Sequence, residues 1–282
     1  MFAIIGIIVV LASVIGGYVL GHGNLHVLWQ PAELIIIGGA AVGSMLISNP
    51  TKVLMDVVKK LPLIFTGKAP SKEEYLEALG LMNALFSKMR KEGLIAIESD
   101  IENPAESAIF AKYPKISANH HAVGYIADNL KVVISTNVTP FELDSVMEME
   151  AEVHHTESLS ASQSITRVGD ALPALGIVAA VLGVILTMGK IAEPPEVLGH
   201  HIGAALVGTF LGILMAYGFV SPFGTNLEHN ANEGSIIFLV IKVALVSFVG
   251  GAAPQIAVEF ARRAIPSTEK PTFNELEESL RS

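Results

Sequence analysis

The stretch TRVGDALPALGIVAAVLGVILTMGK, Thr166 to Lys190, decides the fold, because its run from Ala171 to Met188 contains no ionisable residue. A helix needs roughly 20 mostly apolar residues to cross the hydrocarbon core of a bilayer. The sequence therefore predicts an all-α integral membrane protein with four transmembrane helices. The other three spans are Phe2–Leu20, Leu34–Ser48 preceded by Pro31, and Ile202–Val220.

The composition supports a membrane protein with one sizeable water-exposed part. Of the 282 residues, 51% are hydrophobic and only 16% are charged, whereas about 25% are charged in a soluble domain. Residues 51–168 hold 12 of the 18 Lys and Arg and 16 of the 27 Asp and Glu. The chain has no cysteine, which excludes disulfides and thiolate metal sites, and its net charge of −9 argues against a nucleic-acid partner.

Positive charge near the ends of the spans predicts their direction, because Lys and Arg accumulate on the cytoplasmic side. Four lysines follow the second span and Arg167 precedes the third, while the connection between the first two spans has neither Lys nor Arg. Both termini are therefore expected in the cytoplasm. The predicted segments are 1–48 (transmembrane helices 1 and 2), 49–168 (cytoplasmic helical domain), 169–222 (transmembrane helices 3 and 4) and 223–282 (cytoplasmic C-terminal helices).

The cytoplasmic segments show helical periodicity. Apolar residues recur at helical spacing in Glu73–Arg90, Gly93 is a suitable helix end, and Phe141–His155 is a second amphipathic candidate. The apolar run Ile236–Val249 has only fourteen residues and contains Lys242, so we expect it to be a packed helix outside the membrane.

Small residues mark the contact faces of the last two spans. Ala204, Gly208, Gly212 and Ala216 are four residues apart, which places them on one ridge of a helix. Such a ridge serves either ordinary packing within one chain or a tight bundle or ring of several chains.

Spans three and four carry no ionisable residue at depth, and their polar side chains are hydroxyls such as Thr187, Thr209 and Tyr217. A proton relay normally keeps a carboxylate or a histidine in the membrane, so the titrating group is expected to come from another chain. Glu33 is the one acidic residue that touches a span. It is either an ordinary interfacial carboxylate near a helix N-terminus or a residue of the outer mouth of an ion path.

Two prolines lie at one expected depth, Pro173 at the start of span three and Pro222 at the end of span four. Pro173 either occupies a tolerated first turn or kinks a helix that begins earlier, among Ser158–Arg167. In the second case the two prolines predict a matched pair of bends.

No motif in the chain predicts an enzyme. GVILTMGK lacks the spacing and the Ser/Thr of a phosphate loop, and the adjacent histidine pairs point about 100° apart on a helix, which suits a metal badly. We therefore expect no catalytic residue, no bound metal and no cofactor.

The segment KMRKEGLIAIESDIENPAES, Lys88 to Ser107, has a basic part followed by an acidic part. A charge run of this kind is either a solvated face or a surface for a partner with alternating charges, because exposed pairs steer encounter and set register.

Several segments in order resemble the MotA family of flagellar stator proteins. They are RKEGLIAIESDIENP, FAKYP, GDALPALGIVAAVLGV, LVGTFLGILMAYGFVSP and AAPQIAVEFARR, and the similarity covers nearly the whole chain. The resemblance implies an inner-membrane ring of five copies around a pair of MotB helices. MotB would supply a membrane aspartate that carries protons and an anchor to the cell wall, and the ring would drive the rotor protein FliG.

The same resemblance implies roles for particular residues. Ala180 and Thr209 would lie beside the ion path with Thr187 and Tyr217, and Ala180 favours protons over sodium. Pro173 and Pro222 would couple ion flow to torque, and the rotor contacts would be Arg90, Glu98, Lys91 and Glu150.

The runner-up function is a TolQ/ExbB-type energiser of an envelope transport machine. Those relatives have three spans, so four spans and the DIENP segment favour the stator.

Overall fold

The computed structural model describes residues 2–67 and 69–281, which form two compact units. Of the described residues, unit 1 comprises 2–67 and 158–230, and unit 2 comprises 69–157 and 231–281. The described residues are helical with no strand, which confirms the all-α prediction. Within the part of the chain that the structure describes, four helical stretches are long and apolar enough to cross a membrane: Phe2–Leu20, Leu25–Ser48, Pro140–Met188 and Pro195–Val249.

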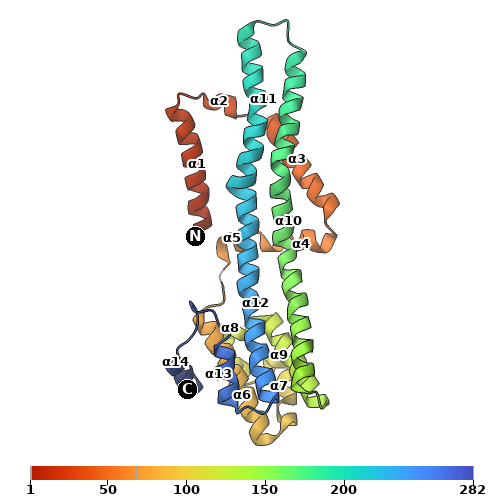
Figure 1. The fold of residues 1–282 in the computed structure, drawn as a ribbon, viewed down its shortest axis with the longest axis vertical. Helices are drawn as coiled ribbons and strands as arrows, with labels where there is room; N and C mark the ends of the chain where they lie inside the picture. Colours follow the sequence, from red (N-terminus) through yellow and green to blue (C-terminus); the bar gives the residue numbers. More distant parts are fainter. Residues whose placement is uncertain (1, 68, 282) are drawn as a thin grey trace. The chain divides into compact units, whose positions relative to one another are not determined.

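Unit 1 contains the predicted spans. Figure 1 shows its central feature, the antiparallel pair α10 and α11 joined by a short turn. Ile37 and Ala41 of α3 are buried in one cluster with Leu172 and Ala179 of α10. The helices of this unit are α1 (Phe2–Leu20), α2 (Leu25–Leu28), α3 (Pro31–Ser48), α4 (Thr51–Lys60), α5 (Leu63–Thr66), the second part of α10 (Pro140–Met188), α11 (Pro195–Met215), the π-helix η4 (Ala216–Val220) and the start of α12 (Ser221–Val249).

Helices α10 and α12 each run without a break from one unit into the other. The predicted third span is thus the last part of a helix of 49 residues, which also contains the expected amphipathic segment Phe141–His155. Pro173 lies inside α10, so it interrupts the hydrogen-bond ladder of a continuous helix and does not start one.

Unit 2 has its own apolar core. Phe86 of α6 stacks on Phe248 of α12 with ring centroids 4.2 Å apart, and Ile237 and Ile241 are fully buried, so Ile236–Val249 packs into this core as expected. The other elements are α6 (Lys72–Glu92), η1 (Leu94–Ile97), α7 (Glu98–Glu102), η2 (Pro104–Glu106), η3 (Phe110–Lys112), α8 (Pro114–Ser117), α9 (His120–Ser135), α13 (Pro254–Arg262) and α14 (Phe273–Arg281).

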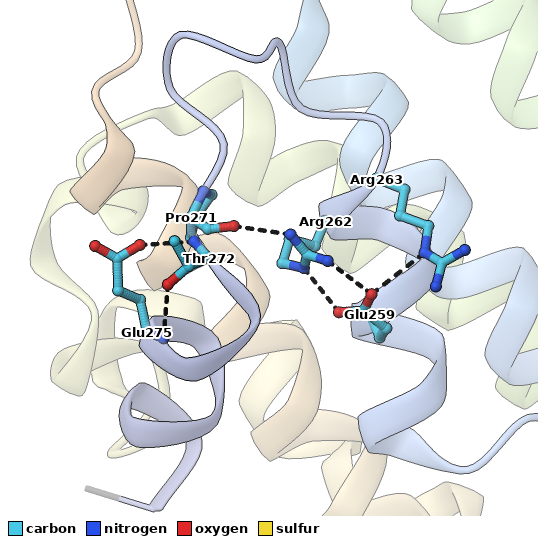
Figure 2. A network of polar contacts seen from close by, with 6 residues as sticks. All are labelled: Glu259, Arg262, Arg263, Pro271, Thr272 and Glu275. Carbon is cyan, nitrogen blue, oxygen red and sulfur yellow. Dashed lines mark hydrogen bonds and ion pairs between the residues drawn. The ribbon is translucent and has the colours of Figure 1, made fainter.

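A polar network fixes the last helix of unit 2. In Figure 2, Arg262 donates to both carboxylate oxygens of Glu259, at 2.7 and 2.8 Å, and to the carbonyl of Pro271 at 2.8 Å. The hydrogen bond from Arg262 holds the pKa of the Glu259 carboxyl below its usual value. Thr272 and Glu275 form a capping box at the start of α14, since each backbone N–H donates to the other's side chain.

Candidate functional site: a glycine-lined helix hairpin and an exposed charged turn

The α10–α11 hairpin is held together by glycines that leave no room for a side chain. A Cβ atom added to Gly212 would lie 2.7 Å from the Cα of Gly176 and 2.7 Å from the carbonyl oxygen of Leu172. A Cβ atom on Gly176 would lie 2.8 Å from the carbonyl oxygen of Gly208. Gly208 and Gly212 of the predicted ridge therefore serve packing within this chain.

The helices that carry Pro173 and Pro222 also approach each other closely beside these two prolines. A Cβ atom on Gly169, one turn before Pro173, would lie 3.1 Å from the backbone nitrogen of Ser221, which directly precedes Pro222. The two prolines thus flank one helix contact. Pro222 has no backbone N–H that could donate to the carbonyl of Gly218, four residues earlier. The π-helix η4 lies just before Pro222, and there the N–H of Ser221 donates to the carbonyl of Ala216, five residues earlier.

The residues predicted beside the ion path fall into two groups. Ala180 lies in the hairpin contact, since a Cβ atom on Gly208 would be 3.0 Å from its backbone nitrogen, and Thr209 is the half-buried neighbour of Gly208. Thr187 is 3% exposed and donates to the carbonyl of Gly183 at 2.8 Å. Tyr217 is 65% exposed in η4, away from these three in sequence.

Glu33, expected either as an interfacial carboxylate or as a residue of the outer mouth of an ion path, is enclosed by other helices of the chain. It lies in the first turn of α3, but only 7% of it is exposed, and its carboxylate packs against Gly183 and Gly208. Sequence reasoning missed this contact because it joins three helices that are far apart in the chain. The only sequence signal is that each facing residue is a glycine.

The charged segment of unit 2 separates into a structural part and an exposed part. Asp100 is 8% exposed and accepts hydrogen bonds from Lys88 at 2.9 Å and from the Ser107 hydroxyl at 2.6 Å. Arg90, Lys91 and Glu98 are exposed, and within residues 2–67 and 69–281 their side chains form no hydrogen bond or ion pair.

The exposed charges lie on either side of a tight turn. Helix α6 ends at Gly93, whose φ of +96° is a backbone conformation that favours glycine, and α7 begins at Glu98. Arg90 and Lys91 are in the last turn of α6, so opposite charges flank the turn. Glu150 is exposed on α10, where it accepts a hydrogen bond from Asn129 at 2.8 Å, and it belongs to a separate surface beside α9.

We expect Asp100→Ala to lower the stability of the protein by about 2–4 kcal/mol, because it removes the acceptor of the partly buried Lys88 ammonium and of the buried Ser107 hydroxyl. The measurement is thermal unfolding of the purified protein in detergent. Glu102→Ala, an exposed position on the same helix, is the control. Equal stability of the two variants would contradict the structural role of Asp100.

Two family matches cover most of the chain. Residues 4–93 match the family described as Motility protein A N-terminal, and residues 115–237 match the MotA/TolQ/ExbB proton channel family. Motility protein A of Escherichia coli strain K12 is 45% identical over 282 residues, which is all of this chain and 96% of that protein.

Two solved structures share the fold. The structure of C. jejuni MotAB superposes with a TM-score of 0.77 at 21% identity, over 96% of this chain and 98% of that one. The flagellar MotAB stator complex from Bacillus subtilis gives a TM-score of 0.73 at 25% identity, over 94% and 96% of the two chains.

Proposed function

Because this chain belongs to the Motility protein A family, we infer that it is a stator subunit of the bacterial flagellar motor, a multi-pass protein of the inner membrane. Its relation to TolQ and ExbB is one of shared family only. The observation that carries this function is the 45% identity to a motility protein along the whole chain, together with the stator fold.

We propose that the subunit works with MotB, the second component of the solved stator complexes. Spans three and four lack an ionisable side chain, so MotB would supply the membrane carboxylate that carries the proton. The coupling ion is a proton, no cofactor takes part, and five copies of the chain surround MotB. Ala180, Thr187, Thr209 and Tyr217 would line the path.

We propose that ion flow reaches the rotor through bends at Pro173 and Pro222. The contact between Gly169 and Ser221 beside them supports a common level for the two bends. The exposed charges Arg90, Lys91 and Glu98, with Glu150, would engage FliG from the cytoplasm, where both termini also lie.

The test is complementation of a non-motile strain that lacks its own stator subunit. We expect this chain, expressed with its MotB, to restore swimming and to co-purify with MotB from membranes. Failure to restore swimming by a complex that assembles normally would refute the stator function.

We expect Ala180→Thr to change the dependence of swimming speed on external pH and sodium, because it places a hydroxyl beside the proposed path. The measurement is swimming speed in matched pH and sodium series. Val181→Thr, a nearly isosteric change at the next residue, is the control and should leave both curves unchanged. Parental curves for Ala180→Thr would remove Ala180 from the path.

A further inference from the structure

Glu33 is a buried carboxyl group without a hydrogen-bond partner. Its Oε2 atom is inaccessible to solvent, and no described residue donates to it. A polar group in such a position costs free energy unless it has a function or a partner that the isolated chain lacks. A carboxyl group inside a membrane protein marks a functional site by default.

Two glycines form a socket for this carboxyl. A Cβ atom on Gly208 would lie 2.6 Å from Oε2, and a Cβ atom on Gly183 would lie 3.3 Å from Oε1. Any larger residue at Gly208 would collide with the carboxyl. Gly208 also faces the backbone nitrogen of Ala180, so Glu33 borders the helix contact in which the proposed path residue Ala180 lies.

Two titratable residues near the socket, Lys190 and His201, lie by the turn that joins α10 and α11. Lys190 Nζ, two residues beyond the end of α10, and His201 Nε2 of α11 are 3.0 Å apart. Each residue is seven positions from a socket glycine, which corresponds to about 10 Å at the helical rise. Thr187, with its buried hydroxyl, lies one turn from Gly183 on the same side. The other titratable groups of the neighbouring elements are His26 on α2, His200, Glu193 and Glu196 near the hairpin turn, and Arg167 and Asp170 at the opposite end of the span.

We propose that Glu33 is a proton-binding group of the ion path, placed between the Lys190–His201 end of the hairpin and the membrane carboxylate of the partner. This inference rests on the proposed stator function. A hydronium ion at the hairpin end gives a proton to Oε2, which leaves water and the neutral acid. The proton then moves to the partner's carboxylate, and Glu33 returns to its anion, so that only O–H bonds form and break.

The relay requires that Glu33 can both bind and release its proton readily, so neither the neutral acid nor the carboxylate anion may be too stable. The neutral acid suits the apolar socket between two glycines. The anion has no hydrogen-bond donor among the described residues, and this favours rapid uptake of the next proton. A permanently ion-paired carboxylate would lack this property, and Glu33 has no ion pair with any described residue.

The decisive variant is Glu33→Gln, which keeps the size of the side chain but cannot release a proton. In a strain that expresses the complete stator, we expect swimming speed to fall by at least about tenfold. The amount of stator in membranes and its co-purification with MotB should be unchanged. Glu196→Gln, at the exposed start of α11, is the matched control and should swim like the parent.

The second variant, Glu33→Asp, retains the acid and separates a relay from a structural role. We expect it to assemble, to swim and to shift the midpoint of the speed profile against external pH, because the shortened acid sits differently in the socket. The proposal is overturned if the assembled Glu33→Gln complex swims at parental speed, or if Glu33→Asp keeps the parental pH profile. Either result leaves the stator function intact, since that function fails only if the parent chain itself does not restore swimming.

Discussion

Gly212→Val is expected to abolish motility by separating the two helices of the hairpin. A Cβ atom at this position would already lie 2.7 Å from backbone atoms of Gly176 and Leu172, and a backbone cannot rotate away as a side chain can. Overpacking of a tight contact costs about 1–3 kcal/mol and more when the backbone has to move. The measurements are swimming, the yield of assembled stator and its thermal stability.

The matched control is Gly43→Val on α3, where a Cβ atom would have no described residue within 4 Å outside its own helical turn. Valine has a higher helix propensity than glycine, so this variant should be at least as stable as the parent. Parental swimming and stability of Gly212→Val would show that the hairpin does not depend on the close approach.

Charge reversal at the turn between α6 and α7 is expected to have the second large effect. Arg90→Glu or Glu98→Lys should strongly reduce swimming while the stator still assembles, because both side chains are exposed and form no hydrogen bond or ion pair with the residues that the structure describes. Opposing like charges across an interface cost several kcal/mol, and each 1.4 kcal/mol is about tenfold in affinity. The measurement is swimming speed together with the amount of stator in membranes.

Arg281→Glu, on the exposed face of α14, is the control for a general effect of charge. A charge reversal in FliG that restores swimming to Arg90→Glu would identify the contact directly. Normal swimming of both reversals would contradict the rotor-contact role of this turn.

The sequence alone predicted those helices that are marked by apolar residues at helical spacing or by a residue that ends the helix. Spans of apolar residues, the stripe of α6 and its end at Gly93 follow from composition, periodicity and the conformational freedom of glycine, and the structure confirms them. The boundaries between the two compact units of the structure lie near residues 67, 157 and 230. The segments expected from the sequence end instead where apolar residues give way to charged residues. These boundaries differ because α10 and α12 continue through the change in composition.

Features that depend on distant residues could not be predicted in this way. Asp100 looked like one more exposed acid, but Lys88 and Ser107 bury it, whereas Arg90, Lys91 and Glu98 stay exposed as expected. The position of Glu33 at the start of a helix does not reveal that α10 and α11 enclose its side chain. Neither environment has a local pattern, since each requires side chains from separate segments to meet.

The π turn before Pro222 has a consequence for the alignment of the hairpin. On one side of it Gly176 faces Gly212, and on the other Gly169 faces Ser221, so seven residues of α10 run past nine residues of the opposite helix. The wider π-helical turn of η4 accommodates the extra residues without rotating the part of the helix that follows. The small residues of that part therefore still face α10, as Gly224 faces Thr166. A chain shortened by one residue here would have to slide one helix along the other, and Gly169 and Ser221 would no longer face each other between the two prolines.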